Sequence, residues 1–334
     1  MSPSSSRQKS FVRPLAVVAF GGNALWQASD VGYMEEQWRR AEQAAEWLIE
    51  VCELGHDLVL VHGNGPQVGQ VLIQMEEAAT KVPPGTLDLA VAQTEGSMGY
   101  LLELALRNRV IERSLDREVS TLLTLVVVDD DDAGFKEPSK PVGPFFSRYR
   151  ASVLQRQLGW EMVEDAGRGW RKVVASPRPL EVVEIETIRT LLAAGSVVIA
   201  GGGGGIPVIA SEGGRLRGVE AVIDKDRTAS LLAQELKADL FVNLTGVPVV
   251  MKSFGKKNAA PLPRLTLAQA RRLHSRGQFP PGSMGPKIES AMDFVEATGS
   301  QAYITDIDHL RETLAGRAGT RIVPDRGGAR TRPE

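Results

Sequence analysis

The sequence predicts an α/β protein, a three-layer α/β/α sandwich with a mostly parallel open sheet and a small lid-like insertion. Short apolar runs typical of buried strands alternate along the chain with longer segments whose apolar residues recur at helical spacing. This alternation is typical of a parallel sheet covered by helices on both faces. Three glycine-rich motifs also follow predicted strands, at the strand ends where open sheets bind ligands.

The first predicted strand, residues 15–20, is apolar throughout and stops at Gly21-Gly22, which marks a turn. The next element, a helix at residues 37–54, has apolar residues at helical spacing and ends near Gly55, a C-cap signal. The same reasoning predicts further strands at residues 58–61, 122–128, 196–200, 240–244 and 301–305. It predicts further helices at residues 68–79, 90–109, 184–194, 228–237, 267–276 and 286–297.

The segment from about residue 129 to residue 179 breaks this alternation. It contains four consecutive aspartates, three closely spaced prolines and two tryptophans. We interpret it as a protruding, lid-like subdomain over the site. We expect one domain at residues 14–325, with disordered tails at 1–13 and 326–334, because the tails are polar and lack the apolar stretch of a signal peptide.

Composition excludes several classes of function. Formal net charge is −2, from 39 basic and 41 acidic side chains, so no global attraction to nucleic acid or anionic membrane is expected. No apolar run reaches the ~18 residues that a membrane-spanning helix needs. Cys52 is the single cysteine, which rules out an intramolecular disulfide and favours a buried structural thiol in a cytoplasmic protein.

The glycine motifs are Phe20-Gly21-Gly22-Asn23, His62-Gly63-Asn64-Gly65-Pro66 and the unbroken run 201–205. Glycine lets backbone N–H groups approach a bound oxyanion, and consecutive N–H groups at a strand end form an anion-binding concavity. Tight turns alone would explain one such motif but not three at corresponding strand ends. The sequence contains neither the Walker phosphate-binding motif nor the usual dinucleotide-binding pattern.

Three lysines stand in settings that suit phosphoryl transfer, which needs cations over the migrating group. Lys140 lies between prolines of the insertion, Lys225 lies between two aspartates, and Lys287 follows a glycine-rich turn. The alternative for each is a solvated surface charge. We expect no protein-built metal site, because the histidines show no metal spacing and the aspartates at 129–132 are typical of a solvated acidic turn.

Motifs along nearly the whole chain resemble the amino acid kinase superfamily and, within it, the carbamate kinases. The matching segments occur in the family's order and are Val18-Ala19-Phe20-Gly21-Gly22-Asn23-Ala24-Leu25, His62-Gly63-Asn64-Gly65-Pro66-Gln67-Val68-Gly69, Pro138-Ser139-Lys140-Pro141-Val142-Gly143-Pro144-Phe145, 164–174, 202–208, Gly218-Val219-Glu220-Ala221-Val222-Ile223-Asp224-Lys225-Asp226 and Gly282-Ser283-Met284-Gly285-Pro286-Lys287-Ile288-Glu289. The resemblance implies a cytoplasmic homodimer of arginine metabolism. It also implies reversible phosphoryl transfer between carbamoyl phosphate and ADP, giving ATP and carbamate, with Mg²⁺ on the nucleotide.

Site residues carry over from the family by position. The resemblance implies that Lys140, Lys225 and Lys287 neutralise developing charge and that Asp226 orients the lysines. Phosphoryl and carbamate binding falls to the glycine motifs, through Gly21, Gly22, Asn23, Gly63, Asn64, Gly65, Gly203 and Gly204. Nucleotide binding falls to Lys225 and Lys287 together with Leu244, Thr245, Val247, Ser283 and Met284.

Two positions near the expected small-substrate side depart from the family pattern. Glu95 and Leu125 each stand where the family often has glutamine. One alternative function is therefore a related kinase acting on another small carboxylate or a phosphonate. The other is a non-catalytic nucleotide-binding regulator, which loss of Lys225, Lys287 or the glycine motifs would have favoured.

Overall fold

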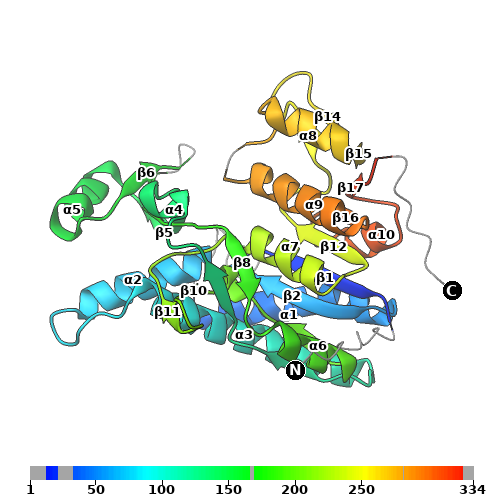
Figure 1. The fold of residues 1–334 in the computed structure, drawn as a ribbon, viewed down its shortest axis with the longest axis horizontal. Coiled ribbons are helices and arrows are strands. Elements are labelled where there is room, and N and C mark those ends of the chain that lie inside the picture. Colours follow the sequence, from blue (N-terminus) through cyan, green and yellow to red (C-terminus); the bar gives the residue numbers. More distant parts are fainter. Residues whose placement is uncertain (1–12, 22–32, 166–168, 281, 326–334) are drawn as a thin grey trace.

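The computed structural model describes residues 13–21, 33–165, 169–280 and 282–325. Its centre is an eight-stranded sheet with the strand order β15-β17-β16-β12-β1-β2-β9-β3 (Figure 1). Neighbouring strands of this sheet run parallel except at the β16–β17 pair, which confirms the mostly parallel sheet predicted from the sequence. The strands are β1 (Leu15–Phe20), β2 (Asp57–His62), β3 (Val119–Thr121), β9 (Val197–Ile199), β12 (Leu240–Leu244), β15 (Arg264–Thr266), β16 (Gln301–Thr305) and β17 (Thr320–Val323).

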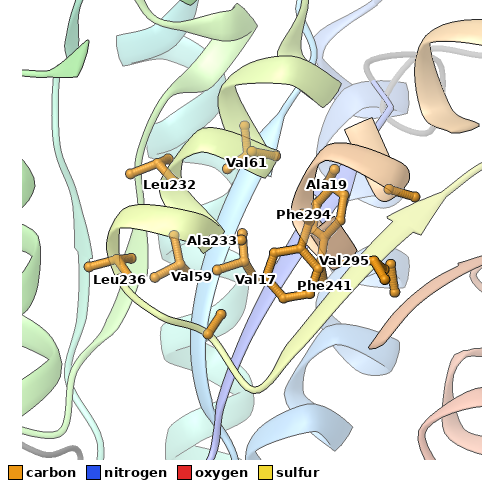
Figure 2. Close-up of a cluster of buried hydrophobic side chains, with 14 of the residues drawn as sticks. Val17, Ala19, Val59, Val61, Leu232, Ala233, Leu236, Phe241, Phe294 and Val295 are labelled. Carbon is orange, nitrogen blue, oxygen red and sulfur yellow. The ribbon is translucent and has the colours of Figure 1, made fainter. Parts of the chain in front are cut away.

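Two hydrophobic cores lie on opposite faces of this sheet because successive side chains of a strand point to opposite sides. In β1, Leu15, Val17 and Ala19 belong to one core and Ala16, Val18 and Phe20 to the other. The first core lies under α6 (Ile185–Ala193), α7 (Lys225–Glu235), α8 (Leu267–Ser275) and α9 (Met284–Thr298), and Figure 2 shows part of it. The second lies under α1 (Met34–Glu53), α3 (Leu87–Glu112) and α10 (Leu310–Leu314), so the fold is the predicted three-layer sandwich.

One predicted strand, residues 122–128, was wrong as a single element. Only residues 125–128 form a strand, β4 (Leu125–Val128), which lies in a separate sheet with β8 (Pro179–Val182), β10 (Ile206–Ala210) and β11 (Leu216–Gly218). Residues 122–124 follow the end of β3 at Thr121 and belong to no strand. The ladder breaks at Thr124, whose N–H donates to the Glu95 carboxylate and whose hydroxyl accepts the Gly201 N–H. A side-chain partner therefore replaces a strand neighbour for the Thr124 N–H, while the Thr124 carbonyl accepts from the N–H of Ile206 in β10 at 2.8 Å.

The segment predicted to form the lid-like insertion projects from the body of the molecule (Figure 1). It contains α4 (Ala133–Lys136), α5 (Arg148–Leu158) and an antiparallel sheet of β5 (Lys140–Phe146), β7 (Trp170–Val174) and β6 (Met162–Glu164). Ala151, Leu154 and Met162 form a small core of its own. A short hairpin of β13 (Met251–Lys252) and β14 (Ala260–Pro261) completes the described strands.

The root of this insertion lies directly on α2 (Gly65–Ala78). A Cβ built on Gly69 would fall 1.8 Å from the Cα of Gly143 in β5, so the two backbones touch and glycine is required at position 69. In the part of the chain that the structure describes, no helix is both long and apolar enough to cross a membrane. Cys52 is buried, and burial raises the pKa of its thiol to about 11, as suits a structural residue.

Candidate active site

The glycine motifs meet at one edge of the large sheet. Strands β12, β1, β2 and β9 are consecutive neighbours, and all three pairings between them are parallel. Their carboxyl ends therefore lie side by side. Asn243 is the last residue but one of β12, and the other three strands lead into Gly21, Gly63 and the run 201–205. Gly22 and Asn23, predicted to bind the phosphoryl group, fall outside the described residues.

Almost every amide of the run 201–205 is used by the fold itself. Gly201 donates to the Thr124 hydroxyl at 2.8 Å and Gly202 donates to Oε1 of Glu95 at 2.8 Å. Gly204 and Gly205 donate to carbonyls of the same loop at 3.0 Å. The Gly203 N–H, which is buried and lies at φ +70°, has no hydrogen-bond partner among the residues that the structure describes. It is the donor that the loop leaves for a ligand.

This loop is locked against the motif that follows β2. A Cβ on Gly202 would fall 2.3 Å from His62 Nε2, and a Cβ on Gly203 would fall 2.2 Å from Asn64 Nδ2. Asn64 in turn donates to the Thr94 hydroxyl at 2.9 Å, which ties it to α3. Two of the predicted anion-binding motifs thus form one rigid unit, and its close contacts explain why the run contains no side chains.

Two of the three predicted lysines share the carboxylate of Asp226, which lies in the first turn of α7. Lys225 donates to Oδ1, and Lys287, from the first turn of α9, donates to Oδ2 at 3.0 Å. Asn243, at the end of β12, accepts a further bond from Lys287 at 2.9 Å. Helices that are distant in sequence therefore place both ammonium groups beside the strand ends.

The charges of Asp226, Lys225 and Lys287 determine which of these side chains are ionised. Burial alone would raise the pKa of Asp226, but Lys225 and Lys287 outweigh burial and hold that pKa well below its ordinary value. Burial lowers the pKa of Lys225, and the neighbouring Asp226 opposes that shift. Asp226 is consequently ionised and holds the ammonium groups in place; it is too weak a base to accept a proton at neutral pH.

Lys140 reaches the same helix end from the insertion. It is the first residue of β5, and its Nζ lies 2.5 Å from Oδ2 of Asp224, the N-cap residue of α7. Burial would raise the pKa of Asp224, but the charge of Lys140 lowers it. The structure therefore gathers Lys140, Lys225, Lys287 and Asp226 around one helix N-terminus, where the helix dipole adds positive potential.

The residues predicted to bind the nucleotide lie next to this cluster. Leu244 ends β12, one residue beyond Asn243, and Thr245 and Val247 follow it, with the Thr245 N–H bonded to the Thr305 carbonyl at 2.8 Å. Ser283 and Met284 begin α9, one turn before Lys287. The first segment therefore directly follows Asn243 in the sequence, and the second shares the first turn of α9 with Lys287.

Several residues of this site escaped prediction. Asn243 and Asp224 hold predicted lysines, and Thr94 and Thr124 hold the glycine motifs. Gln67 is buried, and neither polar atom of its side chain has a partner among the described residues. This is expected for a group that binds a ligand or water. Asn243 is the one polar residue in the otherwise apolar run 240–244, and this feature of the sequence could have indicated a functional role for it.

Two buried titratable groups lie under the glycine loop. Burial lowers the pKa of His62 to about 4, so its ring is neutral, and Nε2 lacks a partner within the described residues. Burial raises the pKa of Glu95 to about 8, although N–H groups of Thr124 and Gly202 oppose that shift. Glu95 forms no ion pair with any residue that the structure describes.

Comparisons with known proteins agree with this geometry. A family model described as the amino acid kinase family matches residues 14–306. The chain belongs to the amino acid kinase family. The carbamate kinase of Pyrococcus furiosus is 41% identical over 310 residues, which are 92% of this chain and 98% of that protein. Carbamate kinase 1 of Enterococcus faecium is 44% identical over 309 residues, which are 92% of this chain and 96% of that protein.

A solved structure gives the same result for this member of the amino acid kinase family. The carbamate kinase from Giardia lamblia bound to AMP-PNP superposes with a TM-score of 0.86 at 38% identity, covering 94% of this chain and 99% of that one. The resemblance that the motifs indicated is thereby confirmed, and so is the fold. Within the described ranges no group of three His, Cys, Asp or Glu side chains suits a metal ion.

Proposed function

We propose that the protein is a carbamate kinase, an ATP-dependent phosphotransferase that transfers a phosphoryl group reversibly between carbamoyl phosphate and ADP, giving ATP and carbamate. One observation carries the proposal: three ammonium groups, held by Asp224 and Asp226, lie at the sheet edge where the Gly203 N–H has no partner among the described residues. This combination suits a doubly charged phosphoryl group in transfer. Relatives named carbamate kinase, similar over nearly their whole length, support the choice of substrate.

In this proposal the protein contributes position and charge. The Gly203 N–H holds an oxygen of the phosphoryl group of carbamoyl phosphate while an oxygen of the ADP β-phosphate attacks phosphorus from the opposite side. The bond from phosphorus to the carbamate oxygen breaks, and carbamate leaves with the electron pair. Lys140, Lys225 and Lys287 offset the negative charge that accumulates on the transferred group and on the leaving oxygen.

We propose that nucleotide and Mg²⁺ enter together. Mg²⁺ usually takes substrate phosphates, waters and one or two carboxylates as ligands, and a dedicated protein cage is uncommon. Asp226 and Asp224 are the carboxylates at this site, and each already holds lysine ammonium groups. The donor set therefore fits an ion that is bound mainly by nucleotide oxygens. Bound in that way, Mg²⁺ would screen the charge of the phosphates.

The decisive assay offers ADP, Mg²⁺ and carbamoyl phosphate to the purified protein and measures ATP with a coupled reporter. We expect ATP formation with carbamoyl phosphate and far less with acetyl phosphate, which lacks the amino group. ATP formed better from acetyl phosphate, or from the phosphorylated form of a phosphonate, would support a related kinase. Nucleotide binding without turnover of any donor would support a regulator and contradict the proposal.

We further propose that the protein acts in arginine metabolism in the cytoplasm and that it is a homodimer. The pathway and location rest on the family resemblance alone. For the dimer, the structure adds an exposed apolar row along α3, formed by Leu89, Tyr100, Leu104 and Ile111. These residues are separated by 11, 4 and 7 positions, close to whole numbers of helical turns, so they share one face of the helix.

A further inference from the structure

Asp224 performs two tasks with its two carboxylate oxygens. Oδ1 accepts the Asp226 N–H at 2.9 Å and thereby caps α7. Oδ2 accepts from Lys140 Nζ at 2.5 Å. The cap fixes the carboxylate at the helix N-terminus, so the ion pair places the ammonium group of the insertion at that same point.

The pair joins two parts of the fold that also share a hydrophobic cluster, in which Val142 of β5 packs with Val68 and Val222 of the body. Lys140 opens β5 at the root of the insertion, and Asp224 lies 84 positions later in the core. The side chains are 26% and 16% exposed, so water screens this pair less than it screens a surface pair. A second ion pair, between Arg150 and Glu76 at 3.9 Å, connects the insertion to α2.

Asp224 therefore forms an ion pair with Lys140 in the same way as Asp226 forms ion pairs with Lys225 and Lys287. Each carboxylate holds its lysines through a short contact, and both lie in or beside the first turn of one helix. A lysine ammonium has three N–H groups, so Lys140 can keep Asp224 and still donate to an oxygen of a bound phosphoryl group. A carboxylate in this position aims the lysine without touching the substrate.

We propose that Asp224 is a positioning residue for phosphoryl transfer, which aims Lys140 at the transferred group and latches the root of the insertion to the N-terminus of α7. The proposal rests on the proposed function for its kinetic part. The latch itself is a property of the folded chain and is testable without turnover.

The test variant is Asp224→Asn, which keeps an N-capping oxygen and removes the charge. We expect kcat for carbamoyl phosphate and ADP to fall about ten- to a hundredfold, with a melting temperature close to that of the wild type. Lys140→Met should lower kcat by a similar factor. Because both changes remove the same ion pair, the double variant should lose less than about threefold more than either single variant.

Hydrogen exchange supplies a second readout that does not depend on activity. Without the latch, amides of residues 140–146 should exchange faster in the ligand-free protein, in both Asp224→Asn and Lys140→Met. The matched control is Glu76→Gln, which removes the Arg150–Glu76 pair near the far end of α2 and should leave kcat unchanged.

Additive losses in the double variant, or Asp224→Asn with wild-type kcat and exchange, would overturn the proposal. If Asp224→Asn does not fold, Lys140→Met alone decides the latch by exchange at residues 140–146. Should the wild type make no ATP from carbamoyl phosphate, the proposed function fails, whereas unchanged exchange in both variants refutes the latch. The two failures are therefore distinguishable.

Discussion

At the scale of single residues, the site depends on carboxylates that hold positive charge in a buried setting. Three lysines and two aspartates leave one net positive charge before any ligand binds. An ionised carboxylate lowers the cost of burying an ammonium group, and the remaining charge favours an anion. The same contacts that keep the lysines charged also fix where they point.

Lys225→Ala separates the catalytic from the structural role of this lysine. The variant leaves Asp226 paired with Lys287, so the buried carboxylate still has a partner. We expect kcat to fall about a hundredfold or more, because one cation over the phosphoryl group is lost. The free energy of unfolding should change by about 1 kcal/mol or less. Activity assays and thermal melts of the same preparations measure the two effects. A large drop in melting temperature would mark Lys225 as structural instead.

Glu95→Gln should change how stability depends on pH. Folded Glu95 keeps its proton up to about pH 8, whereas the unfolded side chain releases it near the ordinary value of 4.5. Between these values the folded chain binds more protons than the unfolded chain, so the stability of the wild type falls as pH rises. Glutamine does not titrate, and it keeps an acceptor for the Gly202 N–H.

The measurement is a pair of thermal melts of wild type and Glu95→Gln at pH 5 and pH 8. The melting temperature of the variant relative to the wild type should be several degrees higher at pH 8 than at pH 5. Loss of the 3.2 Å bond from Thr124 N–H affects both pH values equally and cancels in this difference. An identical offset at both pH values would show that the carboxyl is not protonated in the fold.

At the scale of elements, the glycine motifs differ in what fixes them. A Cβ at Gly202 would collide with His62 and Glu95, whereas a Cβ at Gly21 meets no atom of the described residues within 4 Å. Gly202→Ala should therefore destabilise the fold by about 1–3 kcal/mol. Gly21→Ala should fold normally and lose affinity for carbamoyl phosphate, because its methyl group occupies space at the strand end that the substrate needs.

Denaturant unfolding and the KM for carbamoyl phosphate distinguish these two outcomes. Gly246→Ala is a suitable control for stability, since a Cβ there also meets nothing within 4 Å in the part of the chain that the structure describes, and its φ is ordinary. Equal stability of Gly202→Ala and Gly246→Ala would contradict the packing argument. A wild-type KM in Gly21→Ala would remove Gly21 from the proposed binding site.

Sequence reasoning predicted the elements that local pattern determines. The buried strands at residues 15–20, 240–244 and 301–305 are short and mostly apolar, and the structure places strands with those same bounds. The break at Thr124 escaped because it depends on Glu95 and Gly201, which come together only in the folded chain. Strand ends of a parallel sheet must meet, so the convergence of the glycine motifs could be predicted, but which carboxylate holds which lysine could not.

At the scale of the whole molecule, α3 is apolar on two sides. Its buried side packs on the large sheet with α1, and its outer side carries the row of Leu89, Tyr100, Leu104 and Ile111. Within this row, Ile111 is 74% and Tyr100 58% exposed. A long helix with an uncovered apolar row is typical of an association surface, and a second copy of the chain is the occupant that the proposed homodimer supplies.

Ile111→Glu therefore tests the homodimer. A charge placed in an apolar contact between two copies loses its water without gaining a partner, and we expect the dimer dissociation constant to rise at least about tenfold. Sedimentation velocity over a range of protein concentrations measures this change. Phe254→Glu is the matched control, because Phe254 is 64% exposed but follows β13, away from α3, and its substitution should leave the dimer intact. A dimer that survives Ile111→Glu and dissociates in Phe254→Glu would move the interface from α3 to the face that carries the β13–β14 hairpin.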